Sequence, residues 1–241
     1  MRLAILFVTM GEDSTFESLD AVKQNSTMEH DLIVWNNGCR DREFIERLNG
    51  YTDNVINCTK NQGYLEAINY VFLLCPADAI MILTAGLKPS PGYMELLIKP
   101  FEDERVGIVA EYQFPTGAYI QCGEYDIPEG IDVYRRSMLD DIGGLCPSFV
   151  VWGTAQTELK LRALKKGWKV IGTPRCSEHE NKKGQGKDVF KIDLIAIILL
   201  NNNYIFRVIK RMGFDYKWWD KNVLKMARPG DEIKPDDSVL Y

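Results

Sequence analysis

The most constraining feature of this sequence is a continuous apolar run, Ala79–Leu83, that stops abruptly in a turn-forming segment rich in glycine and proline, residues 84–92. A short apolar run between turn formers is typical of a central strand in a parallel sheet, because such a strand is buried on both faces. In open α/β sheets, ligands bind beyond the carboxyl ends of the strands. We therefore expect Thr84, Ala85 and Gly86 to lie at a binding site, and none of the three has an ionisable side chain.

The segments around this run alternate between strand and helix patterns. Strands are predicted at Leu3–Val8, Asp31–Trp35, Asn54–Cys58, Ala79–Leu83 and Val106–Ala110. Helices are predicted over residues 16–24, 41–48, 61–74 and 92–101. This alternation with short connections predicts an α/β fold with a doubly wound, mostly parallel, Rossmann-like sheet.

Net charge and cysteine content narrow the functional class. The 241 residues carry a net charge of −5, which weighs against a broad nucleic-acid-binding surface. Six cysteines are scattered without a Cys-x-x-Cys pair, and there are only two histidines, so no zinc site is expected. The sequence does not begin with a signal-peptide pattern, and its longest apolar run, Leu194–Leu200, is too short to span a bilayer. We expect a cytoplasmic protein with reduced thiols.

The alternating pattern is interrupted after Ala110. Residues 111–130 show no clear period and predict a long excursion with a short strand or two. A strand over 131–134, helices over 136–142 and 156–166, and a strand over 169–172 are predicted next, followed by a polar, flexible segment, 175–187. We divide residues 1–187 into two halves of one domain, 1–110 and 111–187.

Residues 188–241 are predicted to form a C-terminal long helix and tail packed on this domain. The helix is expected over Asp188–Met212, with apolar residues on one or more faces. The alternative is a peripheral contact of this helix with a membrane surface or another subunit, helped by Trp218 and Trp219. The sequence predicts no particular oligomeric state.

Four motifs, in this order along the chain, resemble nucleotide-sugar glycosyltransferases of the GT-A fold, and specifically family 2. The turn Asn36-Asn37-Gly38-Cys39-Arg40-Asp41 is similar to the family's Asp-Asn-Gly-Ser-x-Asp. Asn61-Gln62-Gly63 with Asn69 resembles its Asn-x-Gly…Asn helix start, and the strand over 79–83 resembles the one that ends in Asp-x-Asp. Residues 130–168 look like its acceptor half, so the resemblance implies a nucleotide-binding half over 1–110 and an acceptor half over 111–187. The resemblance runs from Arg2 to about His179 and implies a GT-A fold that binds a nucleotide sugar.

The resemblance also implies which residues lie at the donor. They are Thr9, Asn36, Asn37, Asp41, Asn61, Gly63, Thr84, Ala85, Gly86, His179 and Lys182. A simpler alternative exists for two groups of them: residues 36–41 could serve only to cap the following helix, and Asn61 and Gly63 only to begin another.

The sequence departs from the family at both of its acidic motifs. The Asp-x-Asp carboxylates of the family hold a divalent metal that clamps the diphosphate, and Thr84, Ala85 and Gly86 stand in their place. The motif therefore does not support a Mn²⁺ or Mg²⁺ cofactor. The family's second acidic motif supplies the base, and its positions fall on Ala155 and Gln156.

A different carboxylate would then have to deprotonate the acceptor. Glu158 follows two residues after Gln156 and is the predicted catalytic base, with Glu111, Glu124 or Asp126 as substitutes. The simpler interpretation of Glu158 is an exposed helical carboxylate.

Positive side chains could replace the charge of the metal at the diphosphate. His179 matches a position where the family often has a histidine, and Lys182, Lys183 and Lys187 lie in a basic loop beside it. Arg135-Arg136 is a second source of positive charge. In the simpler interpretation, these residues are only solvated.

Two functions are consistent with this pattern. The first is a metal-independent transfer of sugar from a nucleotide sugar to an unknown acceptor, such as a glycan, a lipid-linked sugar or a protein. The second is a catalytically degenerate GT-A domain that binds a nucleotide, a glycan or a protein partner. A nucleotidyltransferase is a third option, although that class also normally needs a metal.

Overall fold

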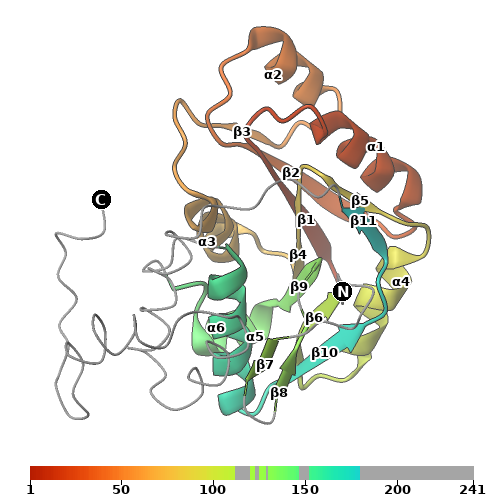
Figure 1. The fold of residues 1–241 in the computed structure, drawn as a ribbon, viewed down its shortest axis with the longest axis vertical. Helices are drawn as coiled ribbons and strands as arrows, with labels where there is room; N and C mark the ends of the chain where they lie inside the picture. The colour runs from red at the N-terminus through yellow and green to blue at the C-terminus, as the bar shows by residue number, and fades with distance from the viewer. Residues whose placement is uncertain (112–119, 123–124, 129, 147–151, 180–241) are drawn as a thin grey trace, which may run out of the picture.

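The computed structural model describes residues 1–111, 120–122, 125–128, 130–146 and 152–179. The strands, all drawn in Figure 1, are β1 (Leu3–Thr9), β2 (His30–Asn36), β3 (Val55–Asn57), β4 (Ala79–Thr84), β5 (Leu87–Pro89), β6 (Val106–Glu111), β7 (Ile120–Cys122), β8 (Tyr125–Ile127), β9 (Asp132–Arg135), β10 (Lys169–Thr173) and β11 (Ser177–His179). The α-helices are α1 (Thr15–Asn25), α2 (Arg42–Asn49), α3 (Tyr64–Leu74), α4 (Tyr93–Ile98), α5 (Arg136–Ile142) and α6 (Trp152–Lys165), and a 3₁₀ turn spans Lys99–Glu102.

Seven of the strands form one twisted sheet in the order β10-β6-β9-β4-β1-β2-β3. All neighbouring pairs are parallel except those of β9, which runs antiparallel to β4 and β6. Two small antiparallel pairs, β5–β11 and β7–β8, accompany the sheet. The predicted α/β, mostly parallel sheet of the GT-A type is confirmed.

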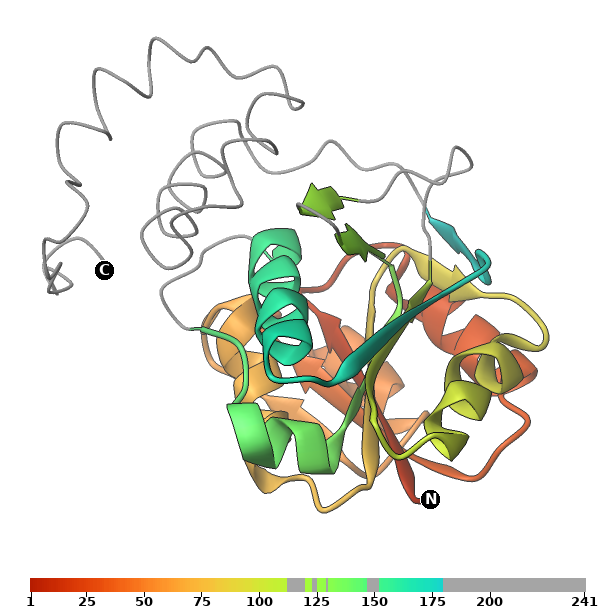
Figure 2. The same ribbon diagram turned by 90° about the horizontal axis from the view of Figure 1, so that it is seen from below.

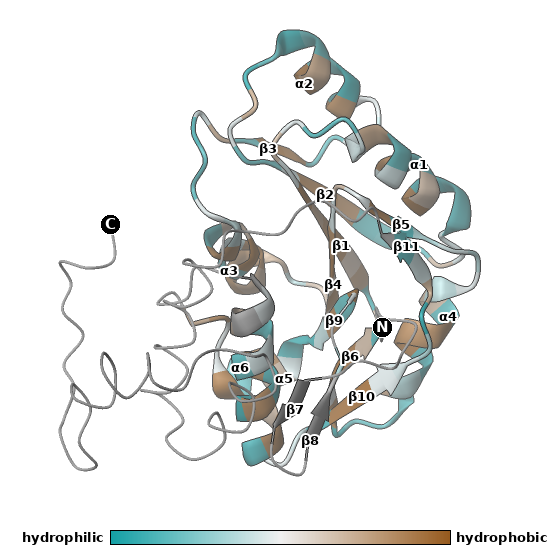
Figure 3. Ribbon diagram, viewed as in Figure 1, coloured by the Kyte–Doolittle hydropathy of each residue, from teal (hydrophilic) through white to brown (hydrophobic). Residues whose placement is uncertain are grey.

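Helices cover both faces of the sheet, as Figure 2 shows end-on. One buried cluster joins the sheet to α3, α5 and α6, and a second joins it to α1, α2 and α4. The central strands β1 and β4 are apolar up to the threonine that ends each of them (Figure 3), because a strand between two helical layers has no solvent-facing side. The run over Ala79–Leu83 is thus the buried central strand that the sequence predicts.

Two local predictions for the second half are corrected. The segment 175–187 is predicted to be flexible, but residues Ser177–His179 form β11, because β5 offers them backbone partners that no sequence pattern reveals. The helix predicted over 156–166 begins four residues earlier, at Trp152.

Several predicted features lie outside the described residues. They include the helix over Asp188–Met212, its possible membrane contact, and Lys182, Lys183, Lys187 and Glu124. Among the helices that the structure does describe, none has the length and apolar character needed to cross a bilayer.

Candidate donor and active site

The loops that follow β1 and β2 meet the segment before α3 at the carboxyl edge of the sheet. The backbone amide of Asn37 donates to the carbonyl of Thr9 over 2.7 Å. Gly38 has a φ of 108°, and a Cβ atom there would lie 2.6 Å from the backbone nitrogen of Asn61. Glycine at this position therefore permits both the backbone conformation and the close approach of the two loops.

Three asparagine side chains hold these loops in shape. The Nδ2 atom of Asn37 donates to Oδ1 of Asn61 over 2.9 Å, and the same oxygen accepts from the amide of Gly63 over 2.8 Å. Asn36 bonds both the amide and the carbonyl of Cys39, at 3.0 and 2.8 Å. Because Asn36 and Asn37 are also buried, a ligand at this edge would meet the backbone that they position.

Thr9 and Asp41 also have structural partners. The hydroxyl of Thr9 donates to Oε2 of Glu12 over 2.8 Å and is itself buried. Oδ1 of Asp41 accepts from the amide of Phe44 over 2.8 Å, which makes Asp41 the N-cap of α2. The simpler interpretation of Asp41 therefore holds in the structure, and its contact with a donor stays a prediction.

The end of β4 carries a hydroxyl group, Thr84, where the resemblance implies a carboxylate of the family. The Thr84 side chain lies close to the Tyr64 hydroxyl and opposes the rise in the pKa of Tyr64 that burial causes, whereas Glu12 and Asp132 add to that rise. Tyr64 is therefore a neutral hydroxyl at physiological pH. Within the described residues, no group of three or more histidine, cysteine, aspartate or glutamate residues is placed to hold a metal ion.

A buried charged cluster lies beside this hydroxyl pair. Nζ of Lys160 lies 2.8 and 3.0 Å from the two carboxylate oxygens of Asp132, and 2.7 Å from the Pro128 carbonyl oxygen. Oδ2 of Asp132 also accepts from the Tyr134 hydroxyl (2.6 Å) and from Nε2 of Gln156 (2.8 Å). Burial raises the pKa of Asp132, while Lys160 acts against that rise. Both charged side chains are fully buried.

Sequence reasoning missed Asp132 and Lys160 as members of the site. Two signals were present: Asp132 is a charged residue inside the apolar strand over 131–134, and Lys160 follows Gln156 by four residues, on the same face of a helix. Neither signal names the partner, because β9 and α6 are brought together only by the fold.

Glu158 lies on a different side of α6 from this cluster. Two residues correspond to about 200° of rotation around a helix, so Glu158 points away from Gln156. Its two carboxylate oxygens accept from Nε and Nη2 of Arg162 over 2.9 and 2.8 Å. Arg162 also donates to the carbonyls of Ile142 and Gly144, which ties α6 to the end of α5. The geometry thus gives Glu158 a positioning contact, and the predicted role as a base stays untested.

β11 brings the chain back to the end of β4. His179 pairs with Leu87, shortly after Thr84-Ala85-Gly86, so its backbone lies beside the end of β4, and its contact with a donor stays a prediction. Glu111, at the end of β6, holds this arrangement: its carboxylate accepts from the amides of Ile131 (3.2 Å) and Cys176 (2.8 Å) and from the Ser177 hydroxyl. Being fully buried and so bonded, Glu111 is placed to support β11.

Arg135 and Arg136 lie at the wrong end of the sheet to reach a diphosphate. Because β9 is antiparallel to β4, its last residue, Arg135, pairs with Ala79 at the start of β4. Arg135 donates to carbonyls such as that of Val106, and Arg136 donates to those of Phe72 and Cys75. Their predicted role as a second source of charge is therefore wrong.

Comparison with known proteins agrees with this arrangement. The model of the family described as "Glycosyl transferase family 2" matches residues 8–143, more than half of the chain. The chain therefore belongs to glycosyl transferase family 2, a family of enzymes that transfer sugars from nucleotide-sugar donors. No curated protein matches the sequence.

Solved structures show the same fold at low identity. The mannosyltransferase PcManGT from Pyrobaculum calidifontis, in complex with GDP-Man and Mn²⁺, matches with 15% identity and a TM-score of 0.60, over 93% of this chain and 68% of that one. Glucosyl-3-phosphoglycerate synthase from Mycobacterium tuberculosis, with Mn²⁺, UDP and phosphoglyceric acid, matches with 16% identity and a TM-score of 0.61, over 88% and 79%. These matches place the chain in the GT-A fold.

Proposed function

We propose that this protein transfers a sugar from a nucleotide-diphosphate sugar to an acceptor hydroxyl without a divalent metal in the family's usual place. The observation that carries the proposal is the end of β4, where Thr84 lies close to the neutral Tyr64 hydroxyl and no carboxylate follows at Ala85 or Gly86. A carboxylate at this point would repel a diphosphate unless a metal stood between them, whereas hydroxyl and backbone N–H groups donate to phosphate oxygens directly.

Positive charge for the leaving diphosphate would come from the segment that follows β11. Lys182 stands three residues after His179, whose backbone lies beside the end of β4. A reach of three residues is about 10 Å, enough to bring an ammonium group over this edge. His179 and Lys182 are therefore proposed as donor-binding residues, together with the backbone of the loops at Thr9, Asn37, Asn61 and Gly86.

The proton of the acceptor hydroxyl needs a base, and we infer that this base is Asp126 rather than the predicted Glu158. Both oxygens of Glu158 are bonded to Arg162, so that ion pair would have to open before Glu158 could bind a substrate. Asp126 lies in β8, which contacts α6, the helix that carries Gln156 at the family's base position. We propose that Asp126 accepts the proton and that Glu158 positions Arg162.

Calorimetry on the full chain tests the metal claim. UDP, GDP, UDP-glucose and GDP-mannose are titrated in Mn²⁺ and in EDTA. We expect one nucleotide to bind with dissociation constants that agree within about twofold in the two conditions. Binding that weakens more than about tenfold in EDTA would overturn metal independence while leaving the transferase in place.

A binding module is the second candidate function, and one contact favours it. Gln156 occupies the place of the family's base, and its Nε2 atom is bonded to the buried Asp132, so it cannot accept a proton. If a nucleotide sugar binds but is neither transferred nor hydrolysed over a day, this second function replaces the first. If nothing binds in either condition, both functions are excluded for uridine and guanosine diphosphate donors.

A further inference from the structure

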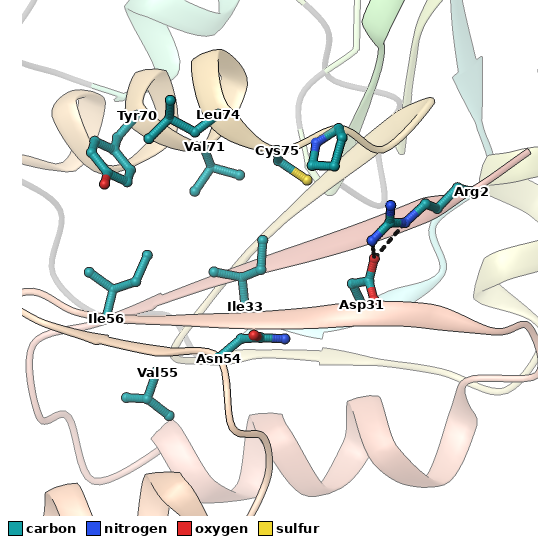
Figure 4. A pocket seen from close by; sticks show the side chains of 11 residues that line it. Arg2, Asp31, Ile33, Asn54, Val55, Ile56, Tyr70, Val71, Leu74 and Cys75 are labelled. Carbon is teal, nitrogen blue, oxygen red and sulfur yellow. Dashed lines mark hydrogen bonds and ion pairs between the residues drawn. The ribbon is translucent and has the colours of Figure 1, made fainter.

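An apolar groove lies between α3 and the β2–β3 edge of the sheet (Figure 4). It has a volume of about 460 Å³. Its apolar walls are formed by Ile33, Ile56, Val71 and Leu74, and the Arg2–Asp31 ion pair closes one end. A nucleotide would have little to bind here, since the walls are mainly apolar and the ion pair is already satisfied.

The outer side of α3 continues this groove as an exposed apolar stripe, Tyr70, Leu73 and Leu74. Leu73 is 81% exposed, Leu74 57% and Tyr70 49%. These residues follow one another at helical spacing, so they share one side of the helix. A contiguous apolar surface of this kind, joined to a groove, indicates a contact with another apolar element.

The chain itself has an apolar segment that could cover this surface. Residues 188–212 contain the run Leu194–Leu200 and further aromatic and branched residues up to Met212. A segment that contains seven consecutive apolar residues, Leu194–Leu200, is stable in water only when that run is packed against another surface.

The described part of the chain ends close enough for this segment to reach α3. His179 pairs with Leu87, which follows Thr84 by three residues, and Thr84 contacts Tyr64, the first residue of α3. Three residues span at most about 10 Å and the facing side chains of Thr84 and Tyr64 add about as much again, so Leu87 lies within about 20 Å of Tyr64, and the 11 residues of α3 add about 16 Å. The nine steps from His179 to residue 188 span up to about 30 Å, and residues 188–212 add about 37 Å if they are helical, so the segment can reach the end of α3 that carries Leu73.

We propose that residues 188–212 of the same chain pack on the α3 surface formed by Tyr70, Leu73 and Leu74 and its groove. This contact goes beyond the proposed sugar transfer, which does not depend on it. Residues 188–212 would then cover the outer side of α3, the helix that begins at the proposed donor site.

Two glutamine variants of the full chain test whether Leu73 is covered. Leu73→Gln and Leu96→Gln make the same change on two helices, and Leu96, on α4, is the less exposed residue at 41%. If α3 stood free in water, Leu96→Gln would be the more harmful variant. Coverage predicts the reverse order: a fall in Tm of about 4–8 °C for Leu73→Gln and of less than about 2 °C for Leu96→Gln.

A photo-crosslink identifies what covers the helix. The full chain carrying the substitution Leu73→p-benzoylphenylalanine is irradiated, and the crosslinked peptides are identified by mass spectrometry. We expect a crosslink within one chain, to a peptide from residues 188–212. A crosslinked dimer on a denaturing gel would assign the surface to a second copy and overturn the proposal. The absence of a crosslink to residues 188–212, or a Tm order that follows simple exposure, would overturn it as well.

Discussion

The buried ion pair between Lys160 and Asp132 offers the sharpest test of how this site is held together. The variant Lys160→Met keeps an unbranched side chain of similar length and removes the charge. Asp132 would then stay fully buried, with only the Tyr134 hydroxyl and the Gln156 amide as polar partners. Leaving one member of a buried ion pair without its partner costs about 3–5 kcal/mol of unfolding free energy.

The loss of unfolding free energy in Lys160→Met should depend on pH in a defined direction. Burial raises the pKa of Asp132, and Lys160 is the largest influence against that rise, so the variant should raise the pKa further. A carboxyl group whose pKa is raised on folding does not lower the unfolding free energy at a pH where it is protonated in both the folded and the unfolded state. The penalty grows as pH rises from the unfolded pKa, near 4, through the folded pKa. We therefore expect the variant to approach the wild type in stability near pH 4 and to be least stable, relative to wild type, above neutral pH.

Urea unfolding, followed by circular dichroism at several pH values, measures the unfolding free energies of the wild type and the variant. At neutral pH the variant should lose about 3–5 kcal/mol, or roughly 10 °C in Tm for a chain of this size. The double variant Asp132→Asn with Lys160→Met is the matched control, since it removes both charges and should recover at least half of the loss. A loss under about 1 kcal/mol, or one that does not change with pH, would refute the reasoning.

Three further variants test other parts of the site. Thr84→Asp places a carboxylate beside the diphosphate, so it should weaken nucleotide binding about tenfold in EDTA, and Mn²⁺ should restore the binding. Calorimetry measures both affinities, and equal weakening in the two conditions would argue against this position for the diphosphate. Gly38→Ala should cost more than about 2 kcal/mol of unfolding free energy. Gly92→Ala should cost only about 1 kcal/mol, because φ is 81° there but a Cβ atom would have nothing within 4 Å. Similar losses in urea unfolding would show that the loops around Gly38 can move apart at little energetic cost. Glu158→Gln should lower Tm by a few degrees while the transfer rate falls less than about tenfold, and a fall of a hundredfold or more at unchanged Tm would instead make Glu158 the base.

The sheet and its binding edge could be predicted because their signals are local. The apolar run of β4, the glycine-rich turn after it and the polar turn after β2 are each contiguous in sequence. Two neighbouring residues were harder to interpret: Arg135 and Arg136 carry the right charge, but their place depends on the direction of β9, and an inserted antiparallel strand has the same local pattern as a parallel one.

The sequence by itself thus determined the fold class and the buried central strand, and it predicts that a donor binds at the end of this strand, where Thr84, Ala85 and Gly86 stand. Only the tertiary structure decided that Asp132 and Lys160 form a buried pair beside Thr84, that Glu158 is bonded to Arg162, and that β11 returns to the end of β4. The physical reason is that hydrophobic period and turn chemistry act between residues close in sequence. The partner of a buried charge or of an edge strand is instead chosen by which distant segments the folded core brings into contact.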